Sequence, residues 1–102
     1  MIVVVFRSRL RENLPDGYEE LGDRMMALAE LMPGFISYKA FSNDDGERVS
    51  IQEWESEKHL RAWREHPEHV IAQNTGRENY YSEYTLYVQE NPRESRFTGD
   101  EI

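Results

Sequence analysis

The sequence predicts one α+β domain of the ferredoxin-like type, with the order β-α-β-β-α-β and both helices on one face of an antiparallel sheet. Three observations support this prediction. The chain has 102 residues, the length of a single domain. Four segments show strand patterning and two show helical spacing of apolar residues. Proline, glycine and Asp-Gly signals separate these segments at the expected boundaries.

The first strand and the first helix differ in their hydrophobic pattern. Residues 2–6 form a continuous apolar run rich in β-branched residues, typical of a strand buried on both faces. Apolar residues then recur at spacings of three and four, which predicts a helix with one buried stripe: Tyr18, Leu21, Met25, Leu28 and Met32. We expect Asp16 to cap this helix with Glu19 as its capping-box partner, and Pro33-Gly34 to end it.

A hairpin and a broken helix follow. Residues 35–42 and 48–54 read as strands joined by a turn at 43–46. Ser56 caps a helix through about Glu65, with Leu60 and Trp63 facing inward. Pro67 ends that helix and opens a short one, which we expect to terminate at residue 76. Residues 79–89 form the last strand, so the domain spans 1–97, with Phe97 as an anchor, and 98–102 form a polar tail.

The strands are apolar on both faces, although helices cover only one. Val3 and Val5 point opposite to their neighbours on the first strand. On the last strand we expect Tyr81 and Tyr87 to point opposite to a second set: Tyr80, Tyr84, Leu86 and Val88. A second copy is the economical cover for the remaining face, so the sequence predicts a homodimer through the sheet faces.

Charge and composition exclude several classes of function. The net charge is −8 and no block of Lys or Arg occurs, which argues against binding nucleic acid or anionic membrane. Without cysteine, no disulfide, thiolate nucleophile or Cys-ligated metal can form, and we expect a cytoplasmic location. The N-terminal apolar run is too short for a signal peptide or a membrane span. No phosphate-binding or dinucleotide glycine motif is present.

Residues 63–77 hold the candidate site. Trp63, His66, His69, Gln73 and Arg77 place an indole, two imidazoles, an amide and a guanidinium around the proline break. Such a set suits a pocket for a flat, partly polar molecule, walled by the indole. His69 or His66 would accept a proton, because imidazole titrates near neutrality. Gln73 and Arg77 follow His69 at one-turn intervals and would bind ligand oxygens.

Structural interpretations of these residues stay open beside the functional ones. Trp54 suits a core or interface position as well as the site. His66 suits a cap at the helix break, and His69 a partly buried structural histidine. Tyr80 and Tyr81 suit sheet packing as well as orientation of a phenolic substrate. We predict no metal site, because no third ligand stands at a telling spacing from the two histidines.

The chain resembles the antibiotic biosynthesis monooxygenase (ABM) domain family of the dimeric α+β barrel superfamily, from Ile2 to about Phe97. The segments that carry the resemblance are Met32-Pro-Gly-Phe35, Trp54-Glu-Ser56, Ala62-Trp-Arg-Glu-His-Pro-Glu-His69, Ala72-Gln-Asn-Thr-Gly-Arg77, Tyr80-Tyr81 and Arg93 to Phe97. The resemblance implies a ferredoxin-like fold and a dimer.

The resemblance also implies candidate activities. Some members oxidise polycyclic phenols with molecular oxygen and no cofactor, because the deprotonated substrate supplies the electrons. Others degrade haem with an asparagine on the first strand, a tryptophan on the second helix and a histidine after it. This chain keeps Trp63 but has Gln73 at the histidine position and Ser8 near the asparagine position.

We therefore predict a monooxygenase without bound cofactor, acting on an aromatic, polyphenolic or quinone-type molecule. Trp63, His66 and His69 are its expected catalytic residues. The expected substrate-binding residues are Gln73, Arg77, Tyr81, Tyr80, Trp54 and Ser8. The alternatives are a haem-binding or haem-degrading monooxygenase and a non-enzymatic ligand-binding dimer.

Overall fold

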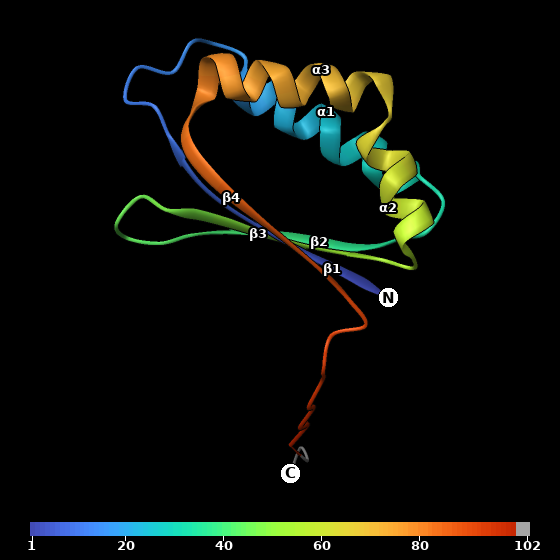
Figure 1. Cartoon of the computed structure of the whole chain (residues 1–102). Helices are drawn as coiled ribbons and strands as arrows, with labels where there is room; N and C mark the ends of the chain where they lie inside the picture. Colours follow the sequence, from blue (N-terminus) through green and yellow to red (C-terminus); the bar gives the residue numbers. More distant parts are fainter. Residues whose placement is uncertain (100–102) are drawn as a thin grey trace.

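A four-stranded antiparallel sheet carries all the helices on one face in the computed structural model, which describes residues 1–99 (Figure 1). The strand order is β2-β3-β1-β4. The elements are β1 Ile2–Leu10, α1 Tyr18–Leu31, β2 Phe35–Ser42, β3 Arg48–Trp54, α2 Glu57–Arg64, α3 Pro67–Thr75, the π-helix η1 Gly76–Tyr80, and β4 Tyr81–Glu90. The predicted ferredoxin-like α+β fold is confirmed.

The hydrophobic core lies between the sheet and the helices. Alternation along β1 turns Ile2 and Val4 toward α1 and α2, and both are buried. The buried core residues are Ile2, Val4, Ala29, Trp54, Leu60 and Trp63, with Met25, Leu28, Met32 and Phe35 packed against them. The predicted stripe of α1 and the inward positions of α2 are thus confirmed.

The helix boundaries confirm some cap predictions and correct others. Ser56 caps α2 by accepting a hydrogen bond from the backbone N–H of His59, as predicted. The prediction for Asp16 is wrong, because Gly17 is the N-cap of α1 in a left-handed conformation and no side chain caps that helix. The predicted end of α3 is confirmed in position, because α3 ends at Thr75 with Gly76 as its C-cap. Gly76 has helical dihedrals, however, and the chain continues without interruption into the π-helix η1, which was not predicted.

The last strand contains an irregularity that sequence alternation did not anticipate. Arg9 pairs with Glu83, but Leu10 pairs with Tyr81, so Ser82 is an extra residue on β4. The Ser82 hydroxyl donates to the carbonyl of Arg9 at 3.2 Å. This bulge puts Tyr81 on the same side of the sheet as Tyr84, which corrects the predicted orientation of Tyr81.

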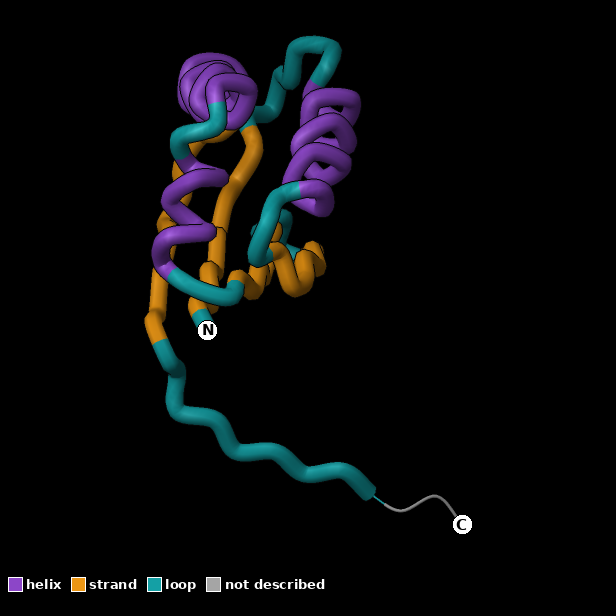
Figure 2. The backbone as a smooth tube through the Cα atoms, turned by 90° about the vertical axis from the view of Figure 1, so that its right-hand side faces the viewer, coloured by secondary structure: helices purple, strands orange, loops and turns teal. Residues whose placement is uncertain are grey.

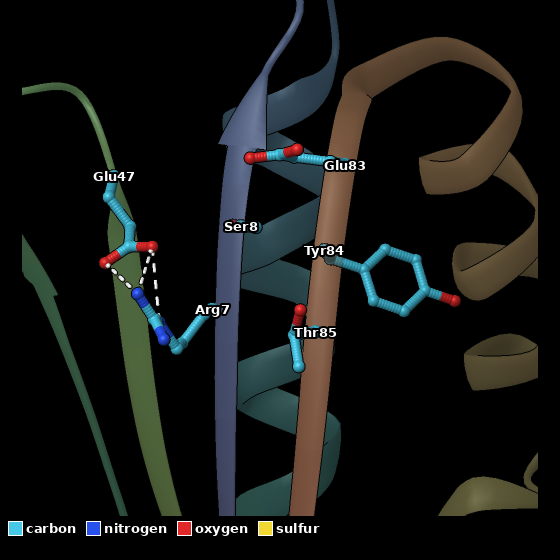
Figure 3. A pocket seen from close by; sticks show the side chains of 6 residues that line it. All are labelled: Arg7, Ser8, Glu47, Glu83, Tyr84 and Thr85. Carbon is cyan, nitrogen blue, oxygen red and sulfur yellow. Dashed lines mark hydrogen bonds and ion pairs between the residues drawn. The ribbon is translucent and has the colours of Figure 1, made fainter.

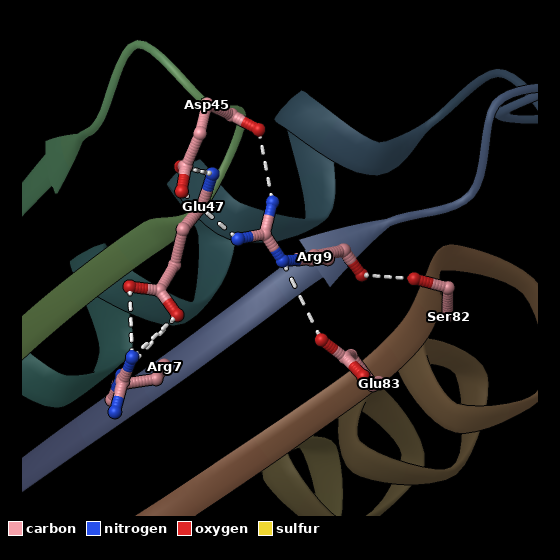
Figure 4. A network of polar contacts seen from close by, with 6 residues as sticks. All are labelled: Arg7, Arg9, Asp45, Glu47, Ser82 and Glu83. Atoms are coloured by element: carbon pink, nitrogen blue, oxygen red, sulfur yellow. Dashed lines mark hydrogen bonds and ion pairs between the residues drawn. The ribbon is translucent and has the colours of Figure 1, made fainter.

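The other face of the sheet, here the open face, is uncovered in the single chain. Phe41, Ile51 and Tyr87 are exposed on it. A polar network joins β1 to the β2–β3 turn and to β4 (Figure 4). Arg7 pairs with Glu47 at 2.9 Å, and Arg9 pairs with Asp45 and Glu83.

Two pockets lie on the open face. One is lined by Arg7, Ser8, Glu47, Glu83, Tyr84 and Thr85 (Figure 3). The other is lined by Ser37, Lys39, Phe41, Ile51 and Glu53. Neither includes a residue of the predicted catalytic set.

Residues 91–99 leave the body of the domain as an extended arm (Figures 1 and 2). Phe97 is 91% exposed, so the predicted anchor is not buried in the body of its own domain. The end of the predicted tail, residues 100–102, lies outside the described residues. Within residues 1–99, no helix has both the length and the hydropathy needed to cross a membrane.

Candidate functional site

Three aromatic rings stack where α2, α3 and the end of β3 meet. The Trp63 indole is 3% exposed and lies between two partners. Its centroid is 4.2 Å from that of His69, at an interplanar angle of 14°, and 6.2 Å from that of Trp54, at 22°. We call Trp54, Trp63 and His69 the indole–imidazole stack. Because Trp63 is almost fully buried and stacked on His69, its indole holds the imidazole in place and leaves little of its own surface for a ligand.

Hydrogen bonds fix the orientation of the His69 ring. Its Nδ1 lies 3.1 Å from the carbonyl oxygen of Trp63 and 3.2 Å from Nε2 of Gln73. Because a carbonyl only accepts, the Trp63 contact assigns the proton of the neutral ring to Nδ1. The amide nitrogen of Gln73 is also a donor, so beside a protonated Nδ1 it is a close neighbour without a hydrogen bond to the ring, and it donates instead to the carbonyl of Arg64 at 3.4 Å. Nε2 then carries a lone pair. Burial lowers the pKa of His69 and outweighs the opposing effect of the Trp63 carbonyl, so the ring stays neutral at pH 7.

His66 has a different role in the structure. It is the N-cap residue of α3, and its Nδ1 accepts a hydrogen bond from the backbone N–H of Glu68 at 3.2 Å. The predicted capping role is therefore confirmed. With Nδ1 occupied as an acceptor, the proton of the neutral ring sits on Nε2, so His66 has no free lone pair. Of the two histidines, His69 is the one arranged as a base.

The predicted polar ridge on α3 reaches β4. Gln73 contacts His69, as described above. One turn later, the guanidinium of Arg77 donates to the Tyr84 hydroxyl at 3.0 Å and to Oδ1 of Asn74 at 2.9 Å. Figure 3 shows the Tyr84 ring extending from β4 toward the helices. Arg77 and Tyr84 thus bridge the end of the helical layer and the edge strand.

A second group of aromatic rings surrounds Tyr81. The rings of Phe6, Tyr18 and Tyr84 each lie edge-on to the Tyr81 ring, with centroids 5.4–6.4 Å apart. Phe6 and Tyr84 also contact each other, tilted, at 5.1 Å. Tyr18 also contacts the buried Tyr80 at 5.2 Å. We call Phe6, Tyr18, Tyr80, Tyr81 and Tyr84 the tyrosine cluster. Burial raises the pKa of Tyr81 well above its ordinary value, so its hydroxyl remains protonated.

The local backbone explains how Tyr81 reaches this position. A Cβ on Gly76 would lie 2.6 Å from the Tyr81 ring, so only glycine fits there. Arg11 fixes the same turn: its backbone N–H donates to the Tyr80 carbonyl, and its guanidinium donates to the carbonyls of Tyr81 and Arg77. π-Helical turns often occur at functional sites.

The structure brings the predicted residues together in two groups. Trp54, Trp63, His69 and Gln73 meet at one end of the helix-facing side, and Tyr80, Tyr81 and Arg77 meet near the other. Ser8 is 4% exposed and faces the helices on β1, where it pairs with Tyr84 and Arg48.

Phe6, Tyr18 and Tyr84 also belong to the site, although they were not among the predicted site residues. The four tyrosines between residues 80 and 87 were the available signal. Because of the bulge, alternation did not show which of them lie on the same side of the sheet. Among the described residues, no group of three His, Asp or Glu side chains could hold a metal ion.

The model of the antibiotic biosynthesis monooxygenase family matches residues 1–75. The chain belongs to this family. The Bacillus subtilis (strain 168) protein YqjZ is 34% identical over 94 residues, covering 92% of this chain and 82% of YqjZ.

Solved structures agree on the fold of this family member. Rv0793 from Mycobacterium tuberculosis superposes with a TM-score of 0.79 at 21% identity, covering 93% of this chain and 98% of that one. SnoaB from Streptomyces nogalater, described as a cofactor-independent oxygenase, superposes with a TM-score of 0.72 at 21% identity, covering 92% and 94%.

Proposed function

We propose that this ABM-family chain is a homodimeric monooxygenase that oxidises a phenolic or quinone-type aromatic molecule with molecular oxygen and no bound cofactor. The observation that carries the proposal is His69, a neutral imidazole stacked on a buried indole, whose Nε2 makes no hydrogen bond with another of residues 1–99. Family membership supports the monooxygenase class, and the similarity in fold to the cofactor-independent oxygenase SnoaB supports a reaction without cofactor.

The proposed substrate lies on the helix-facing side of β4, beneath the ridge of α3. Leu86 and Val88 alternate with Tyr87 and so share this side with Tyr84, yet they are 46% and 41% exposed in the single chain. They provide an apolar floor for a ring system. Gln73 and Arg77 border this strip from the helical side and can donate to ligand oxygens, including a developing oxyanion.

The proposed reaction uses the substrate as its own reductant. Nε2 of His69 takes the acidic proton of an anthrone-type substrate, which leaves a delocalised carbanion. That anion transfers electrons to O2, and a carbon–oxygen bond forms at the same carbon. Loss of water then converts the original CH2 group into a carbonyl, so that one oxygen atom enters the product and the other leaves as water. The protein's contribution is to orient the substrate, stabilise the anion and accept the proton.

The dimer forms part of the proposal. The exposed apolar residues of the open face need a cover, and a second copy packed face to face supplies one. The extended arm, with Phe97 exposed, is free to contact that second copy. A chain without cysteine is compatible with the reducing cytoplasm, where we place it.

Oxygen uptake with dihydroxyanthrone tests the proposal. The wild-type protein is expected to accelerate uptake above the rate in buffer, and the acceleration is expected to be lost in His69→Gln. No acceleration across a panel of anthrones and hydroquinones contradicts the proposed activity. If the same compounds bind without uptake, the chain is a binding module. A saturable Soret shift on haem titration would instead favour the haem-degrading alternative.

A further inference from the structure

Arg48 stands out among the arginines of the sheet because it faces the helices. It pairs in register with Ser8 on β1 and Ser42 on β2, which places it on the helix-facing side. It is half-buried, and its Cζ lies 5.7 Å from the centroid of the Tyr18 ring. Within residues 1–99, its guanidinium forms no ion pair and no hydrogen bond with another side chain.

The arginines on the open face of the same sheet, unlike Arg48, form ion pairs with carboxylates. Arg7 is held by Glu47 through two guanidinium nitrogens, and Arg9 is held by Asp45 and Glu83 (Figure 4). In a chain of net charge −8, acidic partners are abundant. Arg48 nevertheless faces a phenol ring. A cation kept away from carboxylates, in a partly desolvated position, is available to an anion that comes from outside.

The groups around Arg48 are also hydrogen-bond donors. The Tyr81 hydroxyl is close enough to Tyr18, Tyr38 and Arg48 for all three to influence its ionisation, and burial keeps it protonated. Ser8, the register neighbour of Arg48, is buried and carries a hydroxyl. A guanidinium with phenolic donors beside it matches the planar oxygens of a carboxylate, and the edges of Phe6 and Tyr18 suit an attached aromatic ring.

We infer that Arg48, with the hydroxyls of Tyr18 and Tyr81, binds the carboxylate of an aromatic acid at the α1 end of the helix-facing side. Arg48 and Trp54 are the two ends of β3, about 20 Å apart at the rise of an extended strand. The subsite is therefore distinct from the His69 end and does not depend on the proposed oxidation there.

Fluorescence titration with a matched pair of ligands tests the inference. The probes are naphthoate and naphthamide, which share shape but differ in charge. The wild-type protein is expected to bind naphthoate about tenfold more tightly, the size of one charge-assisted contact. Arg48→Gln is expected to abolish this preference while leaving naphthamide binding unchanged. Arg61→Gln removes the same charge from an exposed position of α2 and is expected to keep the preference.

Further variants keep the test decisive if Arg48→Gln folds poorly. Arg48→Lys retains the charge and is expected to keep part of the preference, whereas Tyr18→Phe and Tyr81→Phe are each expected to reduce it by about threefold. Equal affinity of the wild type for both probes overturns the inference. So does a preference that survives in Arg48→Gln, or one that none of the conservative variants changes. Oxygen uptake is measured in a separate experiment, so the binding results can be interpreted even if the proposed oxidation does not occur.

Discussion

The two ends of the helix-facing side differ in how firmly they are built. In the indole–imidazole stack, Trp54 and Trp63 are buried, and His69 is held by stacking on Trp63 and by the hydrogen bond from Nδ1 to the Trp63 carbonyl. In the tyrosine cluster, by contrast, Tyr84 is 39% exposed on the edge strand, although its ring contacts Phe6 and Tyr81 and its hydroxyl accepts from Arg77. The comparison suggests a division of work: one end presents a proton acceptor in a fixed geometry, and the other offers an adaptable surface to a ligand.

The difference has an energetic basis. A stacked, fully surrounded indole contributes through buried apolar area and close packing, so its removal leaves a cavity that its neighbours fill only in part. An exposed tyrosine on an edge strand has fewer neighbours, and a hydrogen bond to an exposed arginine exchanges with water. The stack should therefore contribute more to the stability of the fold than the exposed edge of the tyrosine cluster.

Truncation of one member of each region gives the largest expected effect. Trp63→Ala is expected to lower the free energy of unfolding by about 3–5 kcal/mol, because it leaves a large cavity between Trp54 and His69. Tyr84→Ala is expected to lower it by about 1 kcal/mol or less. Urea unfolding followed by circular dichroism measures both. Equal losses would show that the two regions are not built differently.

The two histidines provide the next test, on activity. His69→Gln is expected to reduce kcat for anthrone oxidation about a hundredfold, the lower range for loss of a general base. His66→Asn is the matched control, because asparagine is a good N-cap and can accept from the Glu68 N–H in place of the imidazole. Its kcat is expected to stay within about twofold of the wild type. A larger loss in His66→Asn than in His69→Gln would reverse the assignment of the base.

Substitution of two glycines by alanine tests whether the backbone at η1 positions the Tyr81 ring. In Gly76→Ala, the new methyl group would overlap the Tyr81 ring, and we expect a loss of about 1–3 kcal/mol in stability together with a changed near-UV spectrum of tyrosine. In Gly22→Ala, nothing lies within 4 Å of the new methyl group, and a gain of about 0.5–1 kcal/mol is expected within α1. A stable Gly76→Ala protein with an unchanged spectrum would show that η1 does not position Tyr81.

The stack could be anticipated from the sequence better than the tyrosine cluster. Helical spacing placed Trp63 inward, and Pro67 placed the break between the two helices at His66. These are local signals, which act over one or two turns. What the pattern did not reveal was that His69 and Trp54 would both stack with the Trp63 indole, since that depends on how α2 and α3 pack against the end of β3.

The tyrosine cluster was harder to predict because it depends on two backbone irregularities. Period-two alternation assigned Tyr81 to the wrong side, and the extra residue Ser82 is the reason. The α-helix α3 ends at Gly76 as expected, but no pattern in the sequence indicated the π-helical continuation, which Arg11 stabilises from a distant part of the chain. Such nonlocal hydrogen bonds leave no periodic signal in the sequence.

The smallest expected effect is on the pH dependence of stability, and it tests whether His69 is as enclosed as the stack implies. Burial lowers the pKa of His69 in the folded state below 6.5, its ordinary value in the unfolded chain. Between the folded-state pKa and 6.5, the unfolded chain therefore binds more protons than the folded protein. The contribution of His69 to stability is therefore complete above pH 6.5 and is lost as the pH falls through that interval. In urea unfolding over this pH range, the free energy of unfolding of His69→Gln is expected to depend less steeply on pH than that of the wild type. Identical slopes would mean that His69 is as solvated in the folded protein as in the unfolded chain, and the distinction between a rigid end and an adaptable one would then no longer hold for its central residue.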